Sequence, residues 1–313
     1  MILEIAEPGA YLSRKHDLFI VKVGDEKREI PAIKVEGIVV FENALITTSA
    51  IKLCLEREIQ LVLCDRTGQL YGRFWHSSSG KNTELRRRQY AAIENACGAK
   101  IMRYILEIKL EEQRKLLRYL RNNRTIQTPE TIEAMRIFDD SVHWLNRQSA
   151  SISKQVLLGI EGNCANVYFQ AISSMLPSKW KFSGRSQHPA NDAFNALLNY
   201  AYGITYREIE KIVIISGLDP NAGFYHTDQY GKPTLTYDII EIFRPKVDRF
   251  VIALLSKRVA KESWFEHNDI EVSLSKIGRK EVIQAFYEKV KPSLQKEAWK
   301  FTRWIVNELM GEP

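Results

Sequence analysis

The sequence lacks the features that mark secreted, membrane-spanning and zinc-ribbon proteins. Its 313 residues include only four cysteines, and no two of them form a Cys-x-x-Cys pair, which argues against a disulfide framework or a zinc ribbon. The first seven residues carry acidic side chains where a secretory signal requires a basic segment followed by an apolar one. No later apolar run is long enough to cross a bilayer. We therefore expect a soluble, cytoplasmic protein.

An excess of negative charge is also lacking. Lysine and arginine number 45 against 38 for aspartate and glutamate, which gives a net charge of +7 and a pI near 9.1. This balance favours a polyanionic partner without identifying it. The hydrophobic content of 45% is sufficient for a packed core, and the length allows one large domain or two ordinary ones.

The first 76 residues are expected to form a small β domain. Short β-branched runs at residues 18–23, 38–41 and 61–64 are separated by residues that favour turns. One short helix should interrupt the strands, because Thr48 or Ser49 can cap a segment whose apolar residues recur every four positions.

A polar segment at residues 77–83, rich in serine and without apolar residues, is the best candidate for a linker. From residue 84 to residue 313 the apolar residues recur at helical spacing, which predicts a helical domain. The fold class expected is therefore α+β, with a small N-terminal β domain followed by a larger all-α C-terminal domain. The helices are expected at about residues 84–121, 130–148, 151–175, 190–216, 237–260 and 279–310.

Glu161 stands on a helical face where apolar residues would predict core. Leu157 and Tyr168 share that face at i−4 and i+7. Gly159 and Gly162 are each about 1 kcal/mol less favourable than alanine inside a helix, so we expect another backbone or a ligand to come close there. The alternative is a buried glutamate that is paired with one arginine.

Two further segments carry polar residues of the same kind. His226 ends the loop at residues 217–226, whose glycine and proline content predicts a compact turn. Asp238 and Glu241 are three residues apart, so they should share one face of the first turn of a helix, which Pro245 should kink or end. The alternatives are a hydrogen-bonded packing histidine and acidic residues that stabilise a helix dipole.

The three segments together predict a metal site. Two carboxylates and one imidazole suit Mg²⁺ or Mn²⁺ with positions left open for water and substrate. Such a site, in a basic protein, is typical of enzymes that cut or join phosphodiester bonds.

Four ordered motifs resemble the CRISPR adaptation integrase family, the metal-dependent subunit that inserts new spacers into CRISPR arrays. The resemblance spans nearly the whole chain and includes residues 38–48 and 65–72 of the front half. Ala190 departs from the pattern, because many relatives have a second proline there. The motifs are Glu161-Gly-x-x-Ala-x-x-Tyr168, Pro189-x-x-Asp192-x-x-Asn195-Ala-Leu-Leu198, Gly217-Leu-Asp-Pro-x-x-Gly223-x-x-His226 and Asp238-x-x-Glu241-x-Phe-Arg-Pro245.

The resemblance implies that Glu161, His226 and Glu241 are the metal ligands, and that Asp238 is an acidic residue that assists them. It also implies that members form homodimers and join a small second CRISPR adaptation protein. The reaction implied is transesterification, in which the 3′-hydroxyl of a captured double-stranded DNA fragment attacks a phosphodiester of the CRISPR repeat. The cofactor implied is Mg²⁺ or Mn²⁺.

Basic residues near these motifs are the candidates for DNA contact. For the cluster at residues 86–88, a merely solvated helix entrance is an equally good interpretation. Two other functions stay open, namely a metal-dependent nuclease that uses water to hydrolyse branched or linear DNA, and a non-catalytic basic scaffold that holds DNA. The DNA-binding candidates are Arg86, Arg87, Arg88, Arg185, Arg244, Lys246 and Arg249.

Overall fold

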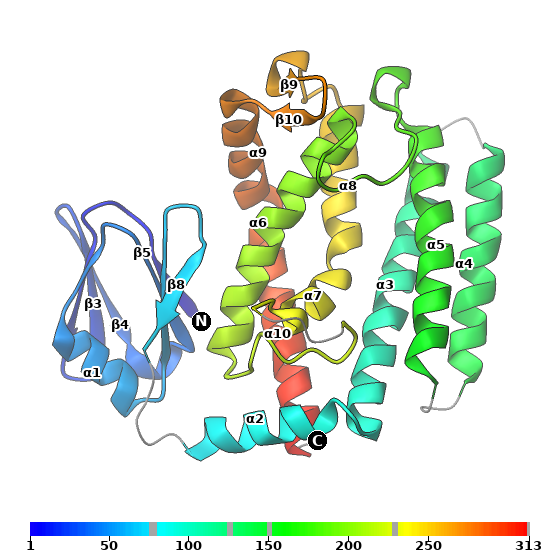
Figure 1. The fold of residues 1–313 in the computed structure, drawn as a ribbon. Helices are drawn as coiled ribbons and strands as arrows, with labels where there is room; N and C mark the ends of the chain where they lie inside the picture. Colours follow the sequence, from blue (N-terminus) through cyan, green and yellow to red (C-terminus); the bar gives the residue numbers. More distant parts are fainter. Residues whose placement is uncertain (75–79, 124–127, 149–151, 227–230, 312–313) are drawn as a thin grey trace. The chain divides into compact units, whose positions relative to one another are not determined.

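The computed structural model, drawn in Figure 1, describes residues 1–74, 80–123, 128–148, 152–226 and 231–311. The chain groups into two compact units. Helices α6 (Ala193–Ile215) and α10 (Lys291–Met310) contribute residues to both of them. The units differ from the expected domains, whose boundary near residues 77–83 stays a prediction. Unit 1 consists of residues 1–91, 207–222 and 298–313, and unit 2 consists of residues 92–206 and 223–297.

Unit 1 contains two four-stranded sheets and helix α1 (Thr48–Glu56). One sheet has the order β1-β5-β7-β8, in which β1, β5 and β7 are parallel and β8 is antiparallel to β7. The other has the order β4-β3-β2-β6. The strands are β1 (Ile2–Ile5), β2 (Tyr11–Lys15), β3 (Leu18–Val23), β4 (Glu26–Pro31), β5 (Gly37–Phe41), β6 (Leu45–Ile46), β7 (Gln60–Cys64) and β8 (Leu70–Arg73), and a 3-10 turn covers Ala32–Lys34.

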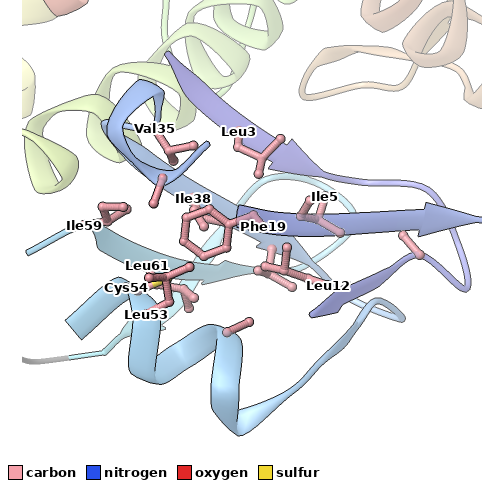
Figure 2. Close-up of a cluster of buried hydrophobic side chains, with 14 residues drawn as sticks. Leu3, Ile5, Leu12, Phe19, Val35, Ile38, Leu53, Cys54, Ile59 and Leu61 are labelled. Atoms are coloured by element: carbon pink, nitrogen blue, oxygen red, sulfur yellow. The ribbon is translucent and has the colours of Figure 1, made fainter. Parts of the chain in front are cut away.

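The core of unit 1 lies on both faces of β5, all of whose residues are buried. Ile38 packs with Phe19 and Leu53 in a cluster that draws on both sheets and α1 (Figure 2). On the opposite face, Val39 packs with Ile215 of α6. A strand covered on both faces reads as a continuous apolar run, and this is why residues 38–41 were recognisable in the sequence.

The cap of α1 differs from the prediction by one residue. Thr47, not Thr48 or Ser49, accepts the hydrogen bond from the amide of Ala50, at 3.2 Å. An N-cap needs extended backbone, and Thr47 has it, whereas Thr48 is already the first helical residue. Cys54 in the same helix is buried, and burial raises the pKa of its thiol to about 12, so it behaves as a small apolar residue.

Unit 2 is built mainly from helices, and α3, α4 and α5 pack as neighbours (Figure 1). The fold class predicted from the sequence is confirmed, with one addition: two short antiparallel strands, β9 (Phe265–His267) and β10 (Val272–Leu274), lie among the helices. No described helix is long and apolar enough to span a membrane. The remaining elements are α2 (Gly80–Ala92), α3 (Ala96–Asn122), α4 (Pro129–Arg147), α5 (Lys154–Met175), α7 (Thr234–Glu241), α8 (Arg244–Ser256) and α9 (Lys276–Lys289), with 3-10 turns at Ser178–Trp180 and Glu262–Trp264.

Three of the expected helices are each divided into two, and the one expected at residues 279–310 divides at Val290, between α9 and α10. The first divides before α3, where the side chain of Asn95 caps the new helix by accepting from the amide of Cys97 at 2.8 Å. The second divides between α7 and α8, because Pro245 lies in the first turn of α8, and this confirms the break expected at that proline. Of the expected linker, residues 77–79 lie outside the described residues, and residues 80–83 begin α2.

The close approach expected at Gly159 and Gly162 is wrong for the described protein atoms. A Cβ added at either position would have nothing within 4 Å. Gly98, in the first turn of α3, is the tight position instead, since a Cβ there would lie 2.0 Å from the carbonyl oxygen of Ala92. The missing side chain therefore matters for packing at Gly98 and not at Gly159.

This difference predicts opposite effects of the same substitution. Gly98→Ala should lower the free energy of unfolding by about 1–3 kcal/mol, because backbone must shift to admit the methyl group. Gly159→Ala should raise it by about 0.5–1 kcal/mol, because alanine is the better helix former and the space is open. Urea denaturation of both variants checks this, and equal shifts would contradict it.

Candidate active site

Two carboxylates and one ammonium group meet inside unit 2. Glu161 comes from α5, Glu241 is the last residue of α7, and Lys109 comes from α3. The ammonium Nζ of Lys109 donates to Oε1 of Glu161 and to Oε2 of Glu241. The side chains of Lys109 and Glu241 are almost fully buried, with exposed fractions of 6% and 5%. Two acidic residues that are far apart in the sequence therefore converge on one cation.

The other oxygen of each carboxylate also has a partner. The hydroxyl of Tyr225 donates to Oε2 of Glu161, and Nε of Arg244 lies 2.7 Å from Oε1 of Glu241. Burial alone would raise the pKa of Glu241, but Arg244 and Lys109 outweigh it and hold the pKa at about 2. Burial and the adjacent Glu161 carboxylate raise the pKa of Tyr225, so its hydroxyl keeps its proton and donates.

The placement of Glu241 corrects an expectation from the sequence. Asp238 and Glu241 do not lie in a first turn, because α7 begins at Thr234 and ends at Glu241. The C-terminal end of a helix dipole is negative, so it disfavours a carboxylate there. The helix-dipole interpretation is therefore wrong, and Glu241 depends on its two cationic neighbours. The single-arginine alternative for Glu161 is also wrong, since its ionic partner is Lys109.

Asp238 organises the backbone that carries His226. Its carboxylate is fully buried, and it accepts from the amides of Phe224 at 2.5 Å, Tyr225 at 2.8 Å and His226 at 2.8 Å. Oδ1 also lies 2.7 Å from Nδ1 of His226. A carboxylate that already accepts three amide protons is suited to accept a fourth hydrogen bond, so in the neutral form of His226 the proton belongs on Nδ1 and the lone pair on Nε2. Metal-binding histidines are commonly oriented in this way by a carboxylate.

Gly223 makes this arrangement possible. A Cβ at this position would lie 2.8 Å from the carbonyl carbon of Thr234 and 2.9 Å from Oδ2 of Asp238. The amide of Gly223 also donates to Oγ1 of Thr234, at 3.0 Å. The glycine of the motif is therefore required because the loop backbone lies directly against the start of α7.

The donor set fits a divalent metal in its chemistry. Glu161 and Glu241 already share one cation, and His226 directly follows Tyr225, whose hydroxyl donates to Glu161. Hard divalent ions prefer carboxylate oxygens, and an imidazole with a free Nε2 completes a mixed site. In the described part of the chain, however, no three of the residue types His, Cys, Asp and Glu are assembled as a ready-made metal cluster. The position between the carboxylates is taken by Lys109.

Comparison with known proteins identifies the family. The family model described as "CRISPR associated protein Cas1" matches residues 3–288. The chain belongs to the Cas1 family. A CRISPR-associated endonuclease Cas1 of Archaeoglobus fulgidus is 32% identical over 302 residues, which cover 92% of this chain and 87% of the relative. A second, from Rhodospirillum rubrum, is 32% identical over 276 residues, covering 86% and 79%.

Solved structures share the fold of this Cas1-family chain. A partial Cas6-RT-Cas1–Cas2 complex contains a chain that matches with a TM-score of 0.81 and 20% identity, over 99% of this chain and 96% of that one. A casposase bound to integration product matches with a TM-score of 0.77 and 21% identity, over 98% and 96%. A Cas1 protein from Thermotoga maritima matches with a TM-score of 0.65 and 19% identity, over 99% and 97%.

A second polar layer lies beside the carboxylates. Asp248 is fully buried in α8 and accepts from the hydroxyls of Tyr168 at 2.6 Å and Tyr202 at 2.5 Å. Burial raises the pKa of Asp248 to about 6, against these hydrogen bonds. The guanidinium of Arg244 lies over the ring of Tyr202, 4.7 Å from its centre. Tyr168 is thus a core residue with a polar tip, and this network holds Arg244 beside Glu241.

The sequence did not reveal Lys109, Tyr225 or Asp248 as site residues. A signal for Lys109 was present, because it lies on the buried face of α3, four residues after Ile105 and four before Gln113. A charged residue on such a face must find a buried partner. Tyr225 had no comparable signal beyond its position next to His226.

The arginines of α2 have unequal surroundings. Nε of Arg86 donates to the carbonyl of Gly217 at 3.3 Å, and Arg88 donates to Glu84 at 2.6 Å and to the carbonyl of Met310 at 2.9 Å. Arg87 is exposed and has no hydrogen-bond or ion-pair partner among the described residues. Arg86 and Arg88 therefore hold unit 1 together, and Arg87 extends into solvent.

The basic candidates of unit 2 also differ from one another. Arg185 is held by the side-chain oxygens of Asn195 and Asn199, each at 2.6 Å. Lys246 pairs with Glu297 at 2.5 Å. Arg249 is exposed, with its guanidinium 4.2 Å from the centre of the Tyr119 ring. Arg249 is consequently the one of these three whose charge has no hydrogen-bond or ion-pair partner among the described residues.

The hydrogen bonds that Asp238 accepts predict that replacing its carboxylate with an amide destabilises the protein. Asp238→Asn should lower the free energy of unfolding by about 1–3 kcal/mol, because the new amide group faces backbone donors and leaves one of them unsatisfied. Asp140→Asn is the control, because the exposed carboxylate of Asp140 on α4 pairs with Arg136 at 3.2 Å instead of accepting from the backbone amides of a loop. Chemical denaturation compares the two, and equal losses would contradict the role given to Asp238.

Proposed function

We propose that this chain is a divalent-metal-dependent DNA integrase of the CRISPR adaptation system. The observation that carries the proposal is the convergence of Glu161 and Glu241 on one cation, beside a histidine whose Nε2 is kept available by Asp238. Glu161, His226 and Glu241 would hold the metal, Mg²⁺ or Mn²⁺. Asp238 would be a positioning residue that acts through His226.

The relatives support this reaction class. The relatives from Archaeoglobus fulgidus and Rhodospirillum rubrum are both named endonucleases. Endonucleases break phosphodiester bonds, so both names indicate this chemistry. Two structures with the same fold are a partial Cas6-RT-Cas1–Cas2 complex and a casposase bound to integration product. We therefore infer strand transfer into DNA, with the chain acting as a homodimer that is joined by a small second adaptation protein.

The reaction would exchange one phosphodiester for another. The oxygen of an attacking 3′-hydroxyl forms a bond to a repeat phosphate, and the bond from that phosphate to the neighbouring 3′-oxygen breaks, so no external energy source is needed. When bound, the metal would supply Lewis-acid stabilisation of the charge that develops on the phosphate.

The protein groups would have distinct tasks in this reaction. Asp238 would keep the proton of His226 on Nδ1, which leaves the lone pair of Nε2 available to the metal. Tyr225 fixes the orientation of Glu161, because its hydroxyl donates to Oε2 of that carboxylate. Arg244, held by the ring of Tyr202, keeps Glu241 ionised.

The proposal predicts that joining depends on the three ligands. A labelled duplex is incubated with supercoiled repeat-containing plasmid, the small partner and Mn²⁺, and joined product is measured for the unsubstituted protein, Glu161→Gln and His226→Ala. Each variant should lose about 100-fold or more, because charge stabilisation by a metal is worth several kcal/mol. Glu133→Gln, an exposed change on α4, is the matched control and should retain activity.

The same assay separates the alternatives. Nicking without joining would favour a hydrolytic nuclease, in which water replaces the 3′-hydroxyl. Neither nicking nor joining, with DNA still bound, would favour a non-catalytic scaffold. Circular dichroism of each variant establishes that a loss of product is not a loss of folding.

DNA binding is predicted to depend on exposed arginines that have no hydrogen-bond or ion-pair partner in the described part of the chain. Arg87→Ala should weaken DNA binding equally for all sequences and reduce the slope of log affinity against log salt by about 1, because one phosphate contact is lost. Arg136→Ala, which removes an exposed arginine that is paired with Glu133 and Asp140 on α4, is the control. Fluorescence anisotropy at several salt concentrations measures both, and an unchanged slope for Arg87→Ala would count against this contact.

A further inference from the structure

The bridge made by Lys109 raises a question about how a divalent ion could enter the site. Its ammonium group occupies the position between Glu161 and Glu241, where the proposed metal would bind. The remaining oxygens of the two carboxylates are taken by Tyr225 and Arg244. Access to both ligands at once therefore requires a protein donor to move.

Charge balance identifies which donor has to move. Lys109 and Arg244 together neutralise Glu161 and Glu241, so these four side chains have no net charge. A divalent ion added between the same carboxylates would lie next to the ammonium group, and like charges at such a distance in a buried site repel strongly. Tyr225 is neutral, and Arg244 is held by the ring of Tyr202, which leaves Lys109 as the group in conflict.

A second position for this ammonium group lies one turn further along α3. Gln113 is buried, with an exposed fraction of 3%, and its Oε1 has no hydrogen-bond partner in the described part of the chain. Residues four apart on a helix are neighbours, and a helical side chain leans toward the turn that precedes it. Gln113 therefore offers an unused buried acceptor within reach of Lys109.

We propose that Lys109 is a displaceable counter-ion that keeps the empty metal site neutral, and that a divalent ion binds by driving its ammonium group from the two carboxylates to Oε1 of Gln113. This inference rests on the proposed metal site. The metal and the ammonium group would then compete for the same carboxylate oxygens. The measured affinity for the metal would depend on how much more strongly the metal binds these oxygens than the ammonium group does.

The test is a calorimetric titration with Mn²⁺ alone, without DNA. Lys109→Met keeps the length of the side chain and removes the competing charge, so it should bind Mn²⁺ about tenfold more tightly. Its metal-free melting temperature should fall, because two buried carboxylates lose their shared partner, and Mn²⁺ should raise it more than in the unsubstituted protein. Lys115→Met removes an exposed lysine of the same helix and should change neither quantity.

Gln113→Leu tests the second position with a change of opposite sign. It removes the acceptor for the displaced ammonium group, so it should weaken Mn²⁺ binding several-fold, although leucine suits a buried position. In the Lys109→Met background the same substitution should have no effect, because no ammonium group needs the acceptor. This variant also keeps the inference testable if Lys109→Met does not fold.

The outcomes separate the inference from the proposed function. Mn²⁺ binding that is lost in Glu161→Gln supports the metal site. Unchanged or weaker binding by folded Lys109→Met, or unchanged binding by Gln113→Leu, overturns the counter-ion role and leaves the metal site standing. Failure of the unsubstituted protein to bind Mn²⁺ in a Glu161-dependent manner would overturn the metal site itself.

Discussion

The structure of unit 2 depends on keeping two acidic side chains close together in a poorly hydrated place. Two carboxylates repel each other unless cations lie between or beside them, and removal of one partner leaves a buried charge without compensation. Lys109 from α3 and Arg244 from α8 supply those cations. The helices α3, α5, α7 and α8 must therefore pack so that these two cations stay beside the two carboxylates. This explains why core helices carry charged side chains on their buried faces.

Several residues near the two carboxylates position the backbone and take no part in the charge balance. Asp238 receives three backbone amides and so fixes the loop that presents His226. Gly223 lacks the Cβ that would separate this loop from α7. Pro245 lies in the first turn of α8, just after the break between α7 and α8, so that Glu241 and Arg244 lie on either side of the break. Some of the motif residues are therefore present because they fold the loop against α7, and not because they are reactive.

Local patterns predicted the fold better than the site. The buried run of β5 and the helical spacing of the later segments give the fold class, because each signal lies within a few adjacent residues. The break at Pro245 followed from its missing amide. The first-turn placement of Glu241 was wrong because the start of α7, set by Thr234, carries no capping signal in the sequence. The expected approach of another backbone segment to the glycines of α5 was wrong, because glycine occurs both at open surfaces and at close contacts and so does not distinguish them.

The partners of Lys109 could not be predicted from the sequence for a different reason. A lysine among apolar residues usually keeps its charge in water by extending its long side chain along the surface, and its true partners lie 52 and 132 residues away. Only the fold shows that its ammonium group ends between two carboxylates. The consequence reaches beyond metal binding. With Lys109 and Arg244 present the four charges cancel, so the proposed divalent ion would leave an excess of positive charge that a DNA phosphate could neutralise, and this would give a physical reason for the proposed metal and DNA to bind together.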